Sequence, residues 1–149
     1  MENAITDLLN ALIPELGELL SDLRFWLGVV MVIGPVIMLL LGGYYLFLSP
    51  KEANHKAGYR TYFGMGSVDA WRFTQKLAGR VYAIAGGVTA IVAIVGCIMM
   101  TGKETTDAVM PSMVILIIEL GLIVVSHALI EIMVTKCFDS QGNRRTKKR

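Results

Sequence analysis

Three long apolar segments dominate the chain, and each has the length of a membrane-spanning helix. They lie at residues 25–48, 81–100 and about 110–134, and the first two contain no charged residue. About 20 mostly apolar residues cross a bilayer as a helix. Backbone amides in hydrocarbon find no hydrogen-bond partner outside their own segment, which favours a helix. The alternative, a membrane β-barrel, needs a period-2 alternation that is absent here. The pattern therefore predicts an all-α membrane protein with three transmembrane helices.

Two amphipathic segments precede the first and second spans. Residues 3–23 carry leucine and isoleucine at three- and four-residue spacing, which predicts a helix that lies on the membrane or packs against a partner. The opposite face of this stripe is acidic, with Asp7, Glu15, Glu18 and Asp22, and such a face does not favour anionic lipid. Residues 68–80 follow Ser67, a predicted N-cap, and mix apolar with basic positions. They predict a cytoplasmic interfacial helix that leads into the second span.

The composition and the positions of the charges agree with this topology. Of 149 residues, 54% are hydrophobic and 17% are charged, against about 25% charged in a typical soluble domain. Disorder, a secreted disulfide scaffold and an ordinary cytosolic enzyme are thereby excluded. Of the 14 basic residues, six lie between the first two spans and six in the C-terminal tail. Because short basic loops stay in the cytoplasm, we expect the N-terminus outside and the C-terminus inside.

The two cysteines are predicted to be free thiols. Cys97 ends the second span near the outer face, and Cys137 follows the third span at the inner face. A disulfide needs Cα atoms within about 7 Å, whereas the hydrocarbon between these depths is about 30 Å thick.

Two motifs on either side of the second and third spans resemble those of a known family. The first consists of Gly58-Tyr59-Arg60-Thr61, then Met65, Ala70-Trp71 and Leu77-Ala78-Gly79. The second consists of Glu131, Lys136, Phe138-Asp139 and Gly142-Asn143-Arg144. Both motifs occur in the expected order, and together they resemble the SdpI family of bacterial membrane proteins over residues 25–145. The chain then divides into an outer amphipathic helix at 1–24, this membrane domain at 25–145, and a basic end at 146–149.

The resemblance implies an immunity or signalling protein in the bacterial cytoplasmic membrane. The family's founding member protects its producer from a secreted antimicrobial peptide, and it holds a transcriptional repressor at the membrane when the toxin is present. By resemblance we expect as partners a peptide toxin and a cytoplasmic regulator, besides the lipid bilayer and a second copy of the chain. The resemblance also implies a cytoplasmic motif formed by Gly58, Tyr59, Arg60, Thr61 and Trp71. The sequence shows no nucleotide-binding glycine pattern, no zinc spacing and no nucleophile–base set, so we expect no enzyme, cofactor, metal or nucleic acid.

The third span carries the ionisable residues of the apolar segments, and these form the candidate intramembrane site. On an ideal helix His127 lies about 80° and Glu131 about 120° from Glu119, so the three share one broad face. Ionisable groups are costly in a span and face protein, water or a partner. One interpretation is an oligomeric channel or proton-coupled transporter that uses Glu119 and His127. The other is structural, with Glu131 paired to a basic residue of the first loop such as Arg60. A third role for the chain as a whole is a structural subunit of a larger membrane complex.

Residues outside this polar face also have two interpretations. Arg60 and Trp71 form either a cytoplasmic docking surface for a partner or a lock that holds the first loop against the helices. The other interpretation is lipid contact, with Trp71 as an interfacial anchor and Arg60 at a lipid phosphate. Small residues recur through the second span, namely Ala83, Gly86, Gly87, Ala90 and Ala93. They predict close helix packing, and we favour packing within the chain over dimerisation.

Overall fold

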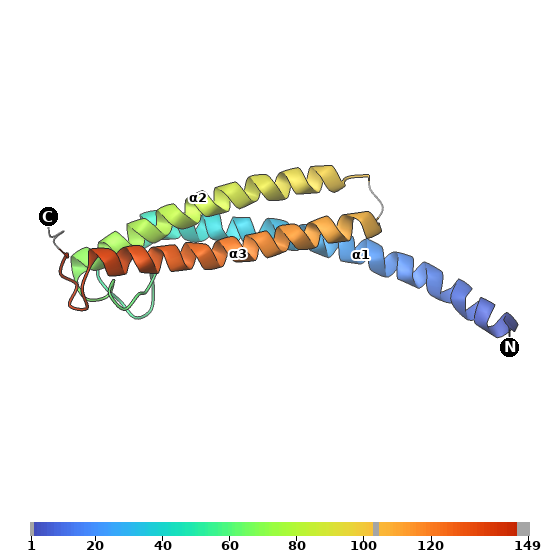
Figure 1. The fold of residues 1–149 in the computed structure, drawn as a ribbon, viewed down its shortest axis with the longest axis horizontal. Helices are drawn as coiled ribbons and strands as arrows, with labels where there is room; N and C mark the ends of the chain where they lie inside the picture. The colour runs from blue at the N-terminus through green and yellow to red at the C-terminus, as the bar shows by residue number, and fades with distance from the viewer. Residues whose placement is uncertain (1, 103–104, 146–149) are drawn as a thin grey trace.

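The computed structural model is a bundle of three long helices (Figure 1). Helix α1 spans Glu2–Gly43 and continues into a short π-helix, η1, at Tyr44–Leu48; α2 spans Val68–Met100 and α3 spans Thr105–Cys137. The structure describes the backbone of residues 2–102 and 105–145, and the side chains of residues 14, 23, 25–102 and 107–145. Within the described backbone, the regular elements are all helical.

The helices run in alternating directions, so the first loop and the C-terminal segment gather at one end. The loop between η1 and α2 and the segment after α3 lie together at that end, which we call the loop end (Figure 1). The N-terminal part of α1 extends past the bundle at the opposite end. Residues 3–23 are therefore continuous with the first span rather than a separate helix. Apart from Leu23, which is exposed, their predicted apolar stripe and acidic face fall on side chains outside the described residues.

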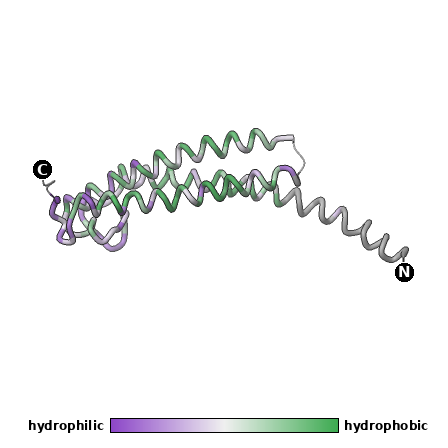
Figure 2. Tube along the Cα trace, in the orientation of Figure 1, coloured by the Kyte–Doolittle hydropathy of each residue, from purple (hydrophilic) through white to green (hydrophobic). Residues whose placement is uncertain are grey.

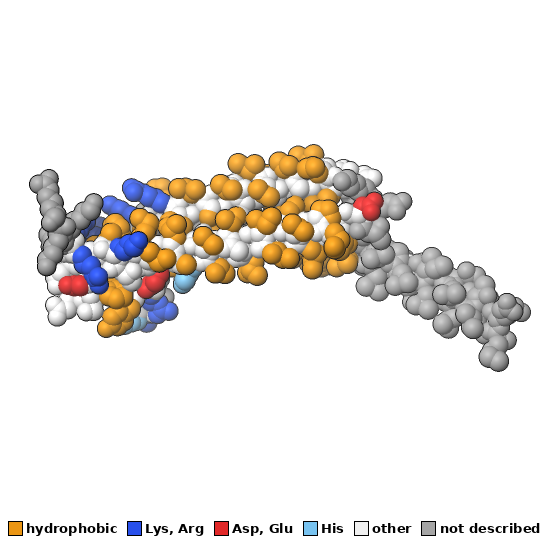
Figure 3. Space-filling view, in the orientation of Figure 1, with side chains coloured by type: hydrophobic (Ala, Val, Ile, Leu, Met, Phe, Trp, Pro, Cys, Tyr) orange, Lys and Arg blue, Asp and Glu red, His pale blue; other side chains and the backbone are white. Residues whose placement is uncertain are grey.

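Three described helices are long and apolar enough to cross a membrane, and this confirms the predicted multi-pass, all-α class. The apolar stretches are Phe25–Leu48, Val68–Met100 and Asp107–Cys137. Hydrophobic positions follow the middle of the bundle, while polar positions gather at the loop end (Figure 2). In the space-filling view the Lys and Arg side chains cluster at that same end (Figure 3). Exposed apolar side chains such as Leu40 and Ile91 are what a lipid-facing surface requires.

Helix α2 begins at Val68 without a break, so residues 68–80 form its first turns and not a helix of their own. Ser67 caps this helix as predicted, because its side chain accepts a hydrogen bond from the N–H of Ala70 at 3.1 Å. Gly79 is buried within α2, where a Cβ would lie 2.6 Å from Cγ of Leu46.

Glycines let α1 and α2 approach closely along antiparallel paths. A Cβ on Gly86 would lie 2.9 Å from the backbone nitrogen of Leu39, and one on Gly42 would lie 2.7 Å from that of Ala83. The predicted packing within the chain is thus confirmed for this face of α2. Gly87 has no heavy atom within 4 Å of such a Cβ, so it faces outward.

The larger of the two clusters of buried side chains in the described residues lies near the loop end and supports the site. Its buried members come from all three helices and the first loop, namely Met38, Tyr59, Ala78, Tyr82, Ile130 and Val134. The rings of Tyr45 and Tyr82 lie 5.7 and 6.0 Å from that of Tyr59, measured between centroids. Cys97 and Cys137 are free thiols, as predicted.

Candidate functional site

The first loop is held on α2 by a buried glutamine. The backbone N–H of Tyr59 donates to Gln75 Oε1 at 2.9 Å, and Gln75 Nε2 donates to the Tyr59 carbonyl at 2.7 Å. The Gln75 side chain is only 2% exposed. A primary amide presents a carbonyl acceptor beside an NH₂ donor group, so it satisfies both backbone groups of one loop residue. The loop can therefore bury Tyr59 without leaving polar backbone atoms unpaired.

Trp71 is the second attachment point of the loop. Its indole N–H donates to the carbonyl of Pro50 at 2.7 Å, and its side chain is completely buried. The interpretation of Trp71 as an interfacial anchor is therefore wrong, because such an anchor exposes its ring to headgroups. Gly58 lies directly on this indole with φ of +98°, and a Cβ there would come within 2.6 Å of the ring. Glycine is thus required at position 58 both for its backbone conformation and for the space.

A hydrogen bond between Tyr59 and His127 joins the loop to α3. The phenol oxygen and His127 Nδ1 are 2.7 Å apart, and the ring centroids are 5.3 Å apart. Burial, followed by the neighbouring Tyr82, raises the pKa of Tyr59 well above its usual value. The phenol is therefore protonated at neutral pH, and it shares this hydrogen bond with His127 Nδ1. His127 is placed by this contact on the exposed side of α3.

The segment after α3 folds into a tight hairpin. Phe138 and Arg144 form an antiparallel bridge, and the N–H of Arg145 donates to the Cys137 carbonyl at 2.9 Å. Asp139 Oδ1 accepts from the backbone N–H of Asn143 at 2.8 Å. This hydrogen bond is the main cause that lowers the pKa of Asp139. The carboxylate thus organises the turn that the Phe-Asp motif introduces.

The hairpin docks on the start of α2, and this contact joins the two sequence motifs. Ser67 Oγ donates to the Gly142 carbonyl at 2.7 Å while it caps α2. A Cβ on Gly66 would lie 2.6 Å from the nitrogen of Gly142, so the two backbones touch. The rings of Phe73 and Phe138 pack with centroids 5.3 Å apart. We call residues 49–67, the first turns of α2 and residues 138–145 together the loop–tail platform.

The predicted link between Arg60 and Glu131 is not formed. Arg60 Nη1 donates instead to the carbonyl of His55 at 2.7 Å, on the exposed surface of the loop. No ion pair joins Arg60 to Glu131 in the part of the chain that the structure describes. The physical reason is the path of the loop, which turns Tyr59 inward and therefore directs the next residue outward.

The polar residues of α3 divide into a buried and an exposed group. Ser112, Glu119 and Ser126 are buried, whereas His127 is exposed and Glu131 is half-buried. Glu119 is 5% exposed, and its Oε1 has no hydrogen-bond partner among the described residues. Its Oε2 faces α1, because a Cβ on Gly34 would lie 3.2 Å away. The structure thus directs Glu119 to α1 and His127 to the loop, rather than bringing the two together.

Metal ligation finds no support in this arrangement. Among the described residues, no group of three or more His, Cys, Asp or Glu side chains is placed to hold a metal ion. Glu119 Oε1 has no hydrogen-bond partner among the described residues, and His127 is hydrogen-bonded to Tyr59.

Two parts of the site were not singled out from the sequence. Gln75 lies within the mixed apolar and basic pattern of residues 68–80, and its i,i+4 spacing from Trp71 places both on one face of the helix. Ser67 was identified only as a cap, and its second bond to Gly142 depends on a fold of the tail that no local pattern encodes. Within residues 58–61, Tyr59 and Thr61 are buried and Arg60 is exposed.

Comparison with known proteins gives one match. The model of the SdpI/YfhL protein family matches residues 50–130, which is more than half of the chain. The matched range includes the first loop, all of α2 and most of α3. Comparisons with curated proteins and with solved structures give no significant match.

Proposed function

The chain belongs to the SdpI/YfhL protein family, and on that premise we propose that it is a non-enzymatic immunity or signalling protein of the bacterial membrane. It acts by binding a peptide or protein partner at the bilayer. The loop end faces the cytoplasm in this proposal, in keeping with its basic side chains. The ligand meets the spans or the opposite end, and the loop–tail platform contacts a cytoplasmic regulator.

The observation that carries the proposal is the construction of the loop–tail platform. A loop that only connected two spans would need none of the bonds that Gln75, Trp71 and Ser67 make. These contacts hold the loop and the tail in one defined shape, and a pre-ordered surface loses less entropy when a partner binds. Tyr62, which is 74% exposed, and Arg60 lie on its outer side and are available to such a partner.

The bond between Tyr59 and His127 supports coupling of this platform to the spans. It connects a buried loop residue to the exposed side of α3. A ligand that shifts α3 against the other helices would therefore strain this contact first. Two sites are coupled when each ligand favours the same arrangement of such a connecting element.

A protection assay tests the proposal. A host that is sensitive to a secreted peptide encoded beside this gene is transformed with the full chain, and survival is measured across peptide concentrations. We expect protection by the native chain, and retained membrane insertion but reduced protection for the Gln75→Leu variant. The Gln141→Leu variant, with the same substitution at an exposed glutamine, is the matched control. Failure to protect against every co-encoded peptide would argue against the immunity role.

Glu119 favours a second candidate function, that of an oligomeric channel or proton-coupled transporter. A carboxyl group buried in a span with an unpaired oxygen is a typical feature of proton or cation paths. Three helices enclose no pathway by themselves, so this function needs several copies of the chain. Proteoliposome flux under a pH gradient tests it, with Glu119→Gln as the variant that should abolish flux. Absence of flux in the native chain would remove this candidate.

A further inference from the structure

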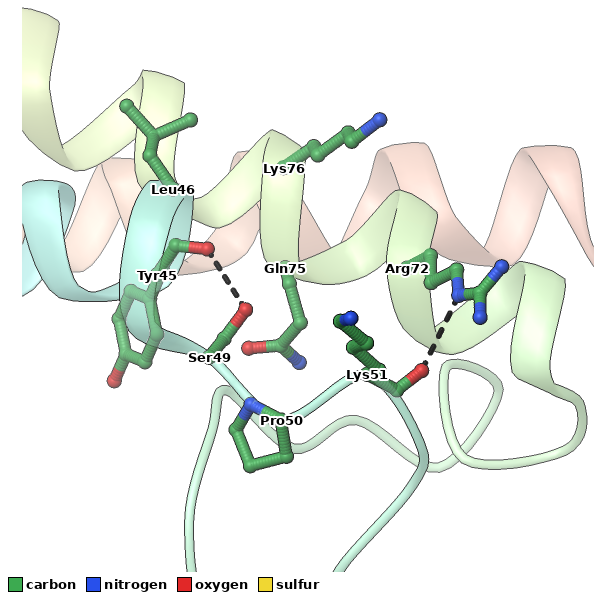
Figure 4. A pocket seen from close by; sticks show the side chains of 8 residues that line it. All are labelled: Tyr45, Leu46, Ser49, Pro50, Lys51, Arg72, Gln75 and Lys76. Atoms are coloured by element: carbon green, nitrogen blue, oxygen red, sulfur yellow. Dashed lines mark hydrogen bonds between the residues drawn. The ribbon is translucent and has the colours of Figure 1, made fainter.

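A groove between η1 and the start of α2 is a candidate site that the proposed function does not use. It has a volume of about 400 Å³ and is lined in part by Leu46, Ser49, Pro50, Lys51, Arg72 and Lys76 (Figure 4). We propose that this groove binds the phosphate headgroup of an anionic phospholipid. The proposal is independent of any peptide ligand.

The charges around the groove suit a phosphodiester. Lys51, Arg72 and Lys76 supply three cations, and none of the residues that line the groove is acidic. Arg72 and Lys76 are four residues apart and therefore share a face of α2. Arg72 Nε donates to the Lys51 carbonyl at 3.2 Å, which keeps the guanidinium beside the lysine and leaves its other N–H groups for a ligand. Figure 4 shows Lys51 next to Arg72, with Lys76 one helical turn along α2.

The depth of the groove favours a lipid over a soluble phosphate. It begins where the apolar span Phe25–Leu48 ends. Phe47 is 83% exposed and Leu48 is also exposed, so an apolar surface that can hold acyl chains adjoins the cations. Basic residues at the end of a span meet lipid phosphates at this level. A soluble anion would gain nothing from the apolar half of this surface.

The groove also borders the contacts that hold the first loop. The Pro50 carbonyl accepts the Trp71 bond, and Gln75, which holds Tyr59, is part of the same wall. A bound headgroup would bridge Lys51 of the loop and Lys76 of α2. We therefore expect the lipid to stabilise the docked loop as well as to occupy the groove.

The test is a lipid titration of the full chain purified in a neutral detergent. The probes are phosphatidylglycerol, phosphatidylcholine and soluble glycerol 1-phosphate, and the readout is the shift of the thermal unfolding midpoint with ligand concentration. We expect a saturable increase with phosphatidylglycerol only. The K51Q/K76Q double variant should bind about fivefold more weakly for each lysine lost. Both lysines are exposed, so the variant should fold, and its circular dichroism and unfolding midpoint without lipid check this.

The K56Q/K136Q double variant is the matched control, because it removes the same charge from exposed positions that do not line the groove. It should retain the native affinity for phosphatidylglycerol. Equal weakening of both double variants would show unspecific attraction by net charge and overturn the proposal. Equal affinity for glycerol 1-phosphate, or for phosphatidylcholine, would also overturn it, because the site would then not select an anionic lipid.

Discussion

The side-chain amide of Gln75 makes two hydrogen bonds with the backbone of Tyr59, one in each direction. The Gln75 side chain thus pairs with the backbone N–H and C=O of Tyr59, as a neighbouring β-strand would do. Tyr59 can then turn its ring into the core and reach His127 on α3. This pair and the bond from Trp71 to the Pro50 carbonyl together hold the first loop on α2.

Replacement of Gln75 by leucine should therefore release the first loop. Two backbone groups of Tyr59 would be left buried without partners, and each such group costs about 1–3 kcal/mol. We expect a loss of about 2–6 kcal/mol in the free energy of unfolding, together with faster proteolysis within residues 49–67. Thermal unfolding in detergent and limited proteolysis measure these effects. Gln141→Leu, at an exposed position, should change neither, and equal behaviour of the two variants would contradict the role of Gln75.

Ser67→Ala should loosen the tail and weaken the start of α2 together. Loss of an N-cap costs about 0.5–2 kcal/mol, and the Gly142 carbonyl also loses its donor. Hydrogen exchange should become faster for the amides of residues 138–145 and of the first turn of α2. Ser140→Ala is the control, because Ser140 lies on the exposed turn of the hairpin. Unchanged protection of the tail in Ser67→Ala would show that the docking does not depend on this bond.

The neighbouring glycines of α2 should respond in opposite ways to alanine. Gly86→Ala places a methyl group 2.9 Å from the Leu39 backbone, and such overpacking costs about 1–3 kcal/mol. Gly87→Ala meets open space and should be neutral or stabilising by up to about 1 kcal/mol, since alanine is the better helix former. Unfolding of both variants in the same detergent measures the difference. Equal destabilisation would mean that Gly87 also lies in an interface, as a dimer through this face requires.

Alkaline pH should weaken the fold through Tyr59. Burial raises the pKa of this phenol above the value of 10.0 for an unperturbed tyrosine, so the folded state holds the proton more tightly than the unfolded state. The resulting stabilisation is complete below pH 10 and is lost as the pH rises above it. In Tyr59→Phe the loss of stability between pH 9 and 11.5 should be smaller than in the native chain. Identical pH profiles would show that the phenol is not buried in the folded state.

Much of the fold could be predicted from the sequence, because each span is long enough to cross a bilayer and the basic segments alternate with segments that carry few basic residues. The limits of the first span, the cap at Ser67 and the close packing at Gly86 all follow from local rules that the structure obeys. The role of residues 68–80 could not be predicted in the same way. Their mixture of apolar and basic positions suits both a separate surface helix and the end of a long buried helix.

The site was predicted only in outline, because its contacts join segments that are far apart in the chain. Opposite charges suggested Arg60 and Glu131 as partners, but the loop path directs Arg60 to the His55 carbonyl. Tryptophan is common at membrane interfaces, yet the loop covers Trp71 completely. In both cases the residue type indicated that the side chain makes a contact. The partner is a backbone carbonyl of the loop, and no pattern of side chains predicts such a partner.

Binding of a peptide by the purified chain in lipid nanodiscs tests the central claim most directly. The probes are the secreted peptides encoded beside the gene, each labelled and titrated against the native chain and against empty nanodiscs. The account predicts saturable binding of one peptide to the native chain and weaker binding to Gln75→Leu, with Gln141→Leu equal to the native chain. No binding above empty nanodiscs for any of these peptides would contradict it.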